Sequence, residues 1–274
     1  MAEVLPPNTF YVVSYPRSGN TWLINCLVMQ LDGVRGEDFP YQLNTEAHGS
    51  PESGFQFWCE PRRRPDQPIC LKSHDAIPLF RQRHPPAPIV YIARDPRDSL
   101  LSYYFFQQAY PSLTKEEIST TQIHGTQVIL SRGSHDPVFR PDEFADFLRR
   151  ETPAWVQHVT TAHTDRDLAF LTYEELTRDF AGTLRRATDH VRIPVIRTSE
   201  EVAKVYHTGF GAVFSGNNRD FFRRGQIGDW KNWYDPAHAR IVAELAGRTL
   251  FDLAFETDPG WADRHQGPAA RPSP

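Results

Sequence analysis

The sequence predicts an α/β protein with three layers, in which a central parallel sheet lies between helices on both faces. Two observations support this fold class. Short apolar runs alternate along the chain with longer segments whose apolar residues recur at a helical period. The runs are apolar throughout, not at every second position, as is typical of parallel strands buried on both faces. The 274 residues are enough for one such domain with a large core.

The predicted elements follow one another in the order that a parallel sheet requires. The first strand covers 9–14, and a helix follows it at Asn20–Leu31. Strands at 68–72 and 88–93 are bounded by prolines and should each lead into a helix, and Leu168–Thr172 is a further strand. The remaining predicted helices cover 141–160, Phe180–Val191, Ser199–Tyr206 and 236–250.

Three segments and the C-terminal end lack this periodicity. The segments 32–66, 110–140 and 214–233 are irregular, and loops of this length within a compact domain usually serve a function. Residues 258–274 are rich in Pro, Ala and Arg and are expected to form a disordered tail. We therefore expect a single domain over residues 1–257.

Composition excludes several classes of protein. The longest apolar runs, such as Ile89–Ala93, are too short to cross a membrane, and residues 1–7 have no features of a signal peptide. The three cysteines, Cys26, Cys59 and Cys70, form neither a zinc pair nor a disulfide framework, so a cytoplasmic location is expected. The formal charge of −4 argues against nucleic acid as the partner.

The turn between the first strand and the first helix has the features of an anion site. Such a turn directs backbone N–H groups toward the helix N-terminus, where an anion can bind. Arg17 adds a positive charge, and Ser18 and Thr21 add hydroxyl donors. Gly19 allows the backbone to approach a ligand closely. An ordinary turn with a surface arginine is the alternative.

The same turn departs from the nucleotide P-loop that it resembles in spacing. A P-loop has glycine where this chain has Ser14 and lysine where it has Asn20. A kinase or nucleotide hydrolase would therefore lack the lysine that binds the terminal phosphates.

A cation and a histidine stand at the end of a second strand. Lys72 and His74 follow the apolar run at 68–72, and ligands of open α/β sheets bind at the carboxyl ends of strands. A single histidine is more often structural than catalytic. The sequence leaves open whether the adjacent Asp75 orients His74.

A third strand end carries an arginine and leads into a helix. Arg94 ends the strand, Asp95 is suited to cap the helix, and Ser102 lies two turns further on. Arg94 and Ser102 could meet on one anion, although a surface arginine and a helical serine would look the same. Arg97 and Asp98 are expected to make surface or packing contacts.

Near the C-terminus, F-R-R-G-Q-I-G-D-W-K-N over 222–232 combines two arginines with two glycines and a tryptophan. Basic loops of this kind are usually solvated, and some bind nucleic acids. Gly228, Asp229, Trp230 and Lys231 are expected to hold the shape of the loop.

Together these segments resemble the PAPS-dependent sulfotransferase family, whose donor is 3′-phosphoadenosine-5′-phosphosulfate (PAPS). The run Y-P-R-S-G-N-T-W at 15–22 is similar to the family's phosphosulfate loop, commonly Y-P-K-S-G-T-T-W. The other three segments occur in the family's order, so the resemblance spans residues 15–232. It implies a P-loop-like phosphosulfate-binding loop that includes Arg17, Ser18, Gly19, Asn20 and Thr21.

The resemblance also implies roles for residues outside that loop. His74 would be the general base, and Lys72 would stabilise charge on the sulfuryl oxygens. The 3′-phosphate would be held by Arg94, Ser102, Arg223, Arg224 and Gly225. Trp22 and Tyr173 would contact the adenine, and Thr208 and Phe210 match a segment near the base. A structural role is a close alternative for the last four residues.

The implied reaction moves a sulfuryl group from PAPS to a hydroxyl or amine of a small-molecule acceptor and releases 3′-phosphoadenosine 5′-phosphate (PAP). Stabilisation of spread negative charge requires no metal, and none is expected. Arg17 stands where the family usually has lysine, and arginine is a poor proton donor, so we expect it to act by its charge.

No motif identifies the acceptor. Aromatic residues in the irregular segments and beside them suggest an aromatic or natural-product molecule: Phe55, Phe57, Trp58, Tyr103, Phe105 and Phe106. Neither nucleic acid nor a membrane is expected as a partner, and a homodimer is left open. The alternatives are a P-loop kinase or hydrolase and a catalytically degenerate nucleotide-binding module.

Overall fold

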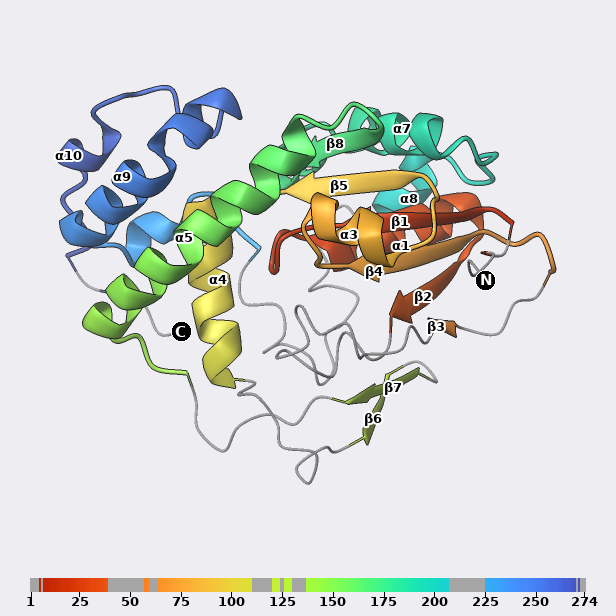
Figure 1. The fold of residues 1–274 in the computed structure, drawn as a ribbon, viewed down its shortest axis with the longest axis horizontal. Helices are drawn as coiled ribbons and strands as arrows, with labels where there is room; N and C mark the ends of the chain where they lie inside the picture. Colours follow the sequence, from red (N-terminus) through yellow and green to blue (C-terminus); the bar gives the residue numbers. More distant parts are fainter. Residues whose placement is uncertain are drawn as a thin grey trace.

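The computed structural model describes residues 5, 7–38, 57–59, 64–109, 120–123, 126–129, 137–206, 225–269 and 271. Within these parts of the chain, the central sheet has six strands in the order β3-β2-β4-β1-β5-β8 (Figure 1). The strands are β1 (Thr9–Val13), β2 (Val34–Asp38), β3 (Phe57–Cys59), β4 (Ile69–Ser73), β5 (Ile89–Ala93) and β8 (Leu168–Thr172). All pairs are parallel except β2 with the edge strand β3. A separate antiparallel pair is formed by β6 (Thr120–Ile123) and β7 (Thr126–Ile129).

The strand register brings the expected site residues to one edge of the sheet. Val13 of β1 pairs with Ser73 of β4, so these two strands end level with each other. Ala93 of β5 pairs with Thr172 of β8 in the same way. Because the four strands are parallel neighbours, the residues that follow them all leave from the carboxyl edge of the sheet.

Helices cover both faces of the sheet, which confirms the three-layer prediction. On one face, Phe10 and Val12 of β1 pack in a buried cluster with α1 (Asn20–Leu31), α7 (Phe180–Val191) and α8 (Ser199–Tyr206). On the other face, Tyr11 and Val13 pack with α3 (Ile77–Arg83), α4 (Pro96–Ala109) and α5 (Pro141–His163). The short helix α6 (Tyr173–Arg178) connects β8 to α7.

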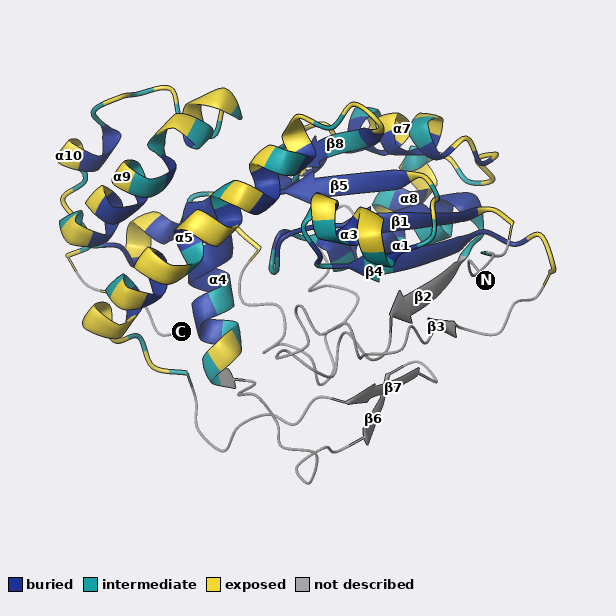
Figure 2. Ribbon diagram, viewed as in Figure 1, coloured by how far each residue is buried: buried dark blue, intermediate teal, exposed yellow. Residues whose placement is uncertain are grey.

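Two further helices extend the second layer. The helix α9 (Pro236–Asp252) packs along α5, and α10 (Trp261–Arg264) packs on α9 (Figure 1). The strands β1, β4 and β5 are largely buried, whereas α5 and α9 alternate between buried and exposed residues (Figure 2). No helix in the described residues combines the length and the apolar character that crossing a membrane would require.

Most predicted elements lie where the sequence placed them. The helices at Asn20–Leu31, Phe180–Val191 and Ser199–Tyr206 and the strand at Leu168–Thr172 agree in both bounds. The helices that start at Pro141 and Pro236 continue to His163 and Asp252. The prediction missed β2, because its sequence V-R-G-E-D has no apolar run and it forms by pairing with β4. It also missed the 3-10 helix η3 (Asp229–Asn232).

The expectation of a disordered C-terminal tail was wrong for the described part of that segment. The side chain of Trp261 in α10 is buried, and its ring lies against the Arg97 guanidinium at 4.6 Å. His265 Nε2 donates to the Tyr234 carbonyl at 2.9 Å, and Arg271 Nε donates to the Trp233 carbonyl at 3.0 Å. These contacts order a segment whose Pro- and Ala-rich composition suggested disorder.

Candidate active site

The loop between β1 and α1 leads into a helix N-terminus at the carboxyl edge of the sheet. Arg17 has φ 65° and Gly19 has φ 94°, so two residues of the turn adopt the left-handed conformation. Gly19 caps α1 without any side-chain hydrogen bond to the helix. The N–H groups of the first turn are therefore not capped by a side chain and can bind an anion.

Gly19 is required at its position by contact as well as by conformation. A Cβ atom there would lie 2.5 Å from a ring carbon of Tyr173. Ser18, the preceding residue, is fully buried, and its Oγ has no hydrogen-bond partner. This hydroxyl, at a helix N-terminus, is available to bond to a ligand.

His74 is held by a backbone carbonyl. Its Nδ1 lies 2.8 Å from the Ser14 carbonyl oxygen, which can only accept, so Nδ1 carries the proton. The other nitrogen, Nε2, is then unprotonated and accepts a hydrogen bond from Asn20 Nδ2 at 3.4 Å. The imidazole is half-buried and stands next to the first residue of α1. This arrangement suits a base that accepts a proton at Nε2.

The carboxylate of Asp75 is bound elsewhere. It is buried, accepts a hydrogen bond from His84 Nε2 at 3.0 Å and lies 3.5 Å from Arg83 Nη1. Its partners are therefore on α3 and at the end of that helix. The Ser14 carbonyl provides an acceptor that orients the His74 ring.

A residue that the sequence analysis did not single out contacts the backbone of His74. His158 in α5 donates from Nε2 to the His74 carbonyl at 3.0 Å. Its Nδ1 lies 2.6 Å from the hydroxyl of Tyr91, which is fully buried. Burial raises the pKa of Tyr91 above its usual range, which keeps this hydroxyl protonated as a donor. His158 is one polar residue of an amphipathic helix, and no motif marks it.

Arg17 and Ser102 are brought together from opposite parts of the predicted site. Arg17 Nε donates to Ser102 Oγ at 3.1 Å, and its guanidinium lies over the Phe106 ring at 4.8 Å. The resemblance implies that Ser102 and Arg94 bind the same phosphate, and in the structure Ser102 accepts a hydrogen bond from Arg17 of the phosphosulfate-type loop.

Lys72 is the next-to-last residue of β4, pairs with Val12 and is half-buried.

Arg94 is fixed in place with one donor unused. Its guanidinium is buried, stacks on the Tyr173 ring at 4.3 Å and donates from Nη2 to the Gln226 carbonyl at 2.9 Å. Its Nε is buried and has no hydrogen-bond partner. A buried charged donor without an acceptor is costly, so an anionic ligand is the expected partner.

Tyr173 connects three of the predicted segments. Besides its contacts with Gly19 and Arg94, its hydroxyl donates to the Gly225 carbonyl at 2.6 Å. Burial raises the pKa of Tyr173, so the hydroxyl stays protonated and can donate. Trp22 is buried and meets the Tyr173 ring edge-on, with 5.4 Å between centroids.

The other predicted site residues are placed as follows. Thr21 Oγ1 donates to Asn20 Oδ1 at 3.3 Å. Gly225 has φ 64° and is the first described residue of its loop. Four predicted residues lie outside the described part of the chain: Thr208, Phe210, Arg223 and Arg224.

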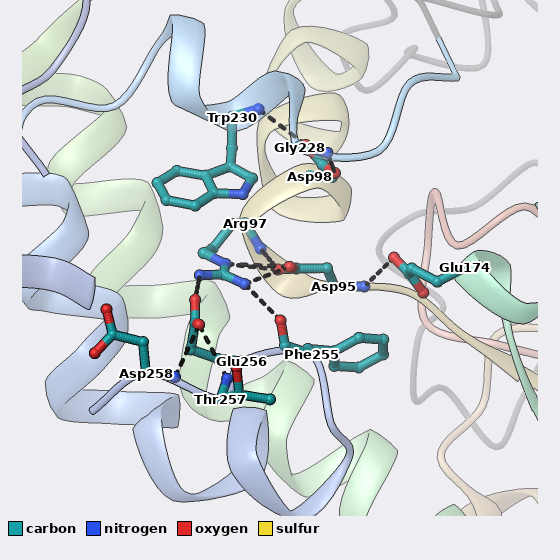
Figure 3. A network of polar contacts seen from close by, with 10 residues as sticks. All are labelled: Asp95, Arg97, Asp98, Glu174, Gly228, Trp230, Phe255, Glu256, Thr257 and Asp258. Atoms are coloured by element: carbon teal, nitrogen blue, oxygen red, sulfur yellow. Dashed lines mark hydrogen bonds and ion pairs between the residues drawn. The ribbon is translucent and has the colours of Figure 1, made fainter. Parts of the chain in front are cut away.

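Arg97 and Asp98 pack in the interior, and the surface alternative is excluded (Figure 3). Arg97 forms a bidentate ion pair with Asp95 and a second ion pair with Glu256, with shortest distances of 2.7 Å. Its guanidinium lies against the rings of both Trp230 and Trp261, at 4.5 and 4.6 Å. Asp98 accepts two backbone N–H groups of the C-terminal loop. Within the described residues, no group of three or more His, Cys, Asp or Glu side chains could hold a metal ion.

The fold is a three-layer α/β fold in which a helix N-terminus lies beside a histidine at the carboxyl edge of the sheet. A model of the sulfotransferase domain matches residues 7–253, and the chain belongs to this family. It is therefore a sulfotransferase. Sulfotransferase 2B1 of Mus musculus is 26% identical over 263 residues, which cover 84% of this chain and 67% of the relative.

Solved structures share the fold. Mouse sulfotransferase SULT7A1, complexed with PAP, superimposes with a TM-score of 0.60 at 20% identity over 93% of this chain and 91% of its own. Retinol dehydratase, complexed with androsterone and PAP, gives a TM-score of 0.54 at 19% identity over 91% and 82% of the two chains.

Proposed function

We propose that this chain transfers the sulfuryl group of PAPS to a hydroxyl or amine of a small acceptor, with His74 as the general base. One observation carries the proposal. His74 Nε2 lies 3.4 Å from Nδ2 of Asn20, the first residue of the helix whose N-terminus would form the anion site. A base and an anion site are thus adjacent, as transfer from an anionic donor requires.

The donor fits the unpaired polar groups of the site. Ser18 Oγ and the N-terminus of α1 would bind the 5′-phosphate and the sulfuryl group. The unused Nε of Arg94 would bind the 3′-phosphate. Tyr173 and Trp22, which meet edge-on beside both groups, would contact the adenine. The PAP complexes of proteins with the same fold support this choice of donor.

In the proposed reaction, the acceptor oxygen or nitrogen attacks sulfur and its proton moves to His74 Nε2. The bond from sulfur to the 5′-phosphate oxygen breaks, and the electron pair stays on the phosphate. Arg17, in the same loop, would stabilise the charge that develops there. Ser102 Oγ holds the Arg17 guanidinium in place for this task.

The acceptor is proposed to be a largely apolar alcohol or phenol. Retinol dehydratase, which shares the fold, binds androsterone, an apolar molecule. Of the aromatic residues expected in the acceptor pocket, Phe105 packs in the core against Trp233 and is excluded. Phe106 and Tyr103 are half-buried and are the described candidates for its wall. A cytoplasmic location is proposed because Cys26 and Cys70 are buried and form no disulfide.

The function is tested by transfer of labelled sulfate from PAPS to a panel of phenols, alcohols, amines and glycans, with EDTA present. We expect labelled product from at least one phenol or alcohol, and none with the His74→Ala variant, which should still bind PAP. Full activity of His74→Ala would show that another group is the base. Binding of PAP without transfer to any acceptor would favour a degenerate module, and phosphate release from ATP with magnesium would favour a hydrolase.

A further inference from the structure

Asp98 holds the C-terminal loop against the first turn of α4. Its Oδ2 accepts the N–H of Gly228 at 2.6 Å, and its Oδ1 accepts the N–H of Trp230 at 2.9 Å (Figure 3). Both donors are backbone groups at the start of η3, and Gly228 has φ 80°. One buried carboxylate therefore fixes the path of the chain over Gly228–Trp230.

The residues just before this point contact the proposed 3′-phosphate site. The Gly225 carbonyl accepts from the Tyr173 hydroxyl, and the Gln226 carbonyl accepts from Arg94 Nη2. These contacts also use the backbone of the loop. The position of the Arg94 guanidinium is thus tied to the place where the loop lies.

The surroundings of Asp98 explain why its contact with the loop is strong. The carboxylate is fully buried, so its two N–H bonds are made away from water. Arg94 attracts the negative charge, whereas Asp95 repels it. Burial raises the pKa of Asp98 to about 6, so the group is ionised at neutral pH and can accept both bonds.

We propose that Asp98 is a positioning residue of the 3′-phosphate site, which it serves by docking Gly228–Trp230 onto α4. The docked loop presents the Gln226 carbonyl to Arg94 Nη2, and this contact directs the unused Nε of Arg94. The inference rests on the proposed function, because it takes the 3′-phosphate as the partner of Arg94. Asp98 itself does not touch the nucleotide.

A purely structural role for Asp98 makes a different prediction. If it only stabilised η3, its loss would lower stability and weaken all ligands alike. If it positions Arg94, its loss weakens ligands that carry a 3′-phosphate and spares those that lack it. The dissociation constant for adenosine 5′-phosphate divided by that for PAP separates the two roles, because only the positioning role predicts that this ratio falls.

The test measures both dissociation constants by calorimetry for the wild type and for Asp98→Asn. Asparagine keeps the shape but loses the charge and turns an N–H donor toward one of the loop N–H groups. We expect PAP to bind about tenfold more weakly and adenosine 5′-phosphate to bind almost unchanged, since a hydrogen bond to a charged group contributes about this much. Equal weakening of both ligands, or no weakening, would refute the positioning role.

Asp235→Asn is the matched control. Asp235 also accepts two backbone N–H groups, from Ala237 at 2.9 Å and His238 at 3.0 Å, but at the start of α9. This variant should melt at a lower temperature and keep the wild-type ratio. A wild type that does not prefer PAP over adenosine 5′-phosphate would overturn the 3′-phosphate site itself, and with it this role of Asp98.

Tyr173→Phe tests the same loop should Asp98→Asn fail to fold. It keeps the ring that packs on Gly19 and Arg94 and removes only the donor to the Gly225 carbonyl. The proposal expects a lower ratio in this variant as well. A folded Tyr173→Phe protein with the wild-type ratio would contradict the idea that docking of the loop directs Arg94.

Discussion

His158 Nε2 lies 3.0 Å from the backbone carbonyl oxygen of His74, and through this contact α5 holds the end of β4. The carbonyl can only accept, so His158 donates from Nε2 and, when neutral, accepts at Nδ1 from the Tyr91 hydroxyl. Tyr91 lies in β5, which β1 separates from β4, so the proposed base is held through a covering helix that is itself bonded to another strand of the sheet. The base is thereby fixed at its backbone as well as at its ring.

We expect His158→Phe to lower kcat about tenfold or more and to leave the dissociation constant of PAP unchanged. Phenylalanine keeps the ring contacts with Tyr15 and Tyr91 but cannot donate to the His74 carbonyl. Small displacements of a base are costly, because proton transfer depends on its distance and angle. Steady-state kinetics and calorimetry measure the two quantities.

His163→Phe is the control for this prediction, since His163 is exposed on the same helix. It should keep the wild-type kcat. An unchanged kcat in a folded His158→Phe protein would limit His158 to a role in packing.

Arg17→Ala should reduce turnover about a hundredfold or more, as does the loss of other groups that stabilise transition-state charge. The affinity for PAP should fall much less, because Ser18 and the helix N-terminus remain. Single-turnover rates and PAP titrations provide the comparison. Arg149→Ala, which removes an exposed arginine of α5, should change neither. A rate equal to wild type would remove Arg17 from the mechanism.

Gly19→Ala should destabilise the protein by roughly 1–3 kcal/mol, the cost of a non-glycine residue in a strained conformation. At φ 94° the added Cβ would also meet the Tyr173 ring at 2.5 Å, so the ring must move. Urea unfolding measures the change in free energy. Gly247→Ala is the opposite case, because nothing lies within 4 Å of its added Cβ in α9, and it should stabilise the protein slightly.

The sequence predicted the parts of the site that depend on strand ends. The turn at Arg17, His74 and Arg94 each follow an apolar run, and parallel pairing of those runs brings them to one edge. Contacts between distant segments could not be predicted in this way. The approach of Arg17 to Ser102 depends on how α4 packs against the sheet, which no local pattern specifies.

The contacts of buried polar residues also could not be predicted from local sequence patterns. For Asp98 the sequence predicted only surface or packing contacts, since its partners in the loop are far away in sequence. The prediction missed β2 for a related reason. Most of its residues have low strand propensity, and they form a strand because they pair with β4. In both cases the structure is determined by tertiary contacts and not by the local sequence pattern.

The last prediction concerns the buried carboxyl of Glu174, whose Oε1 accepts the Asp95 backbone N–H at 3.1 Å while Oε2 has no partner. Burial raises the pKa of Glu174 to about 7, and Asp95 adds to the rise. The folded protein thus binds this proton more tightly than the unfolded chain. The resulting stabilisation is fully present below about pH 4.5 and is lost as the pH rises through about 7.

Glu174→Gln removes this ionisation and keeps a carbonyl oxygen for the Asp95 N–H. Relative to wild type, its free energy of unfolding should therefore be higher at pH 8 than at pH 4.5, by up to about 3 kcal/mol at 1.36 kcal/mol per pKa unit. Urea unfolding at the two pH values measures the difference, and Glu200→Gln, at an exposed position of α8, should show none. A difference of the opposite sign would mean that Glu174 is more strongly stabilised as a carboxylate, by the nearby Arg94, than burial destabilises it.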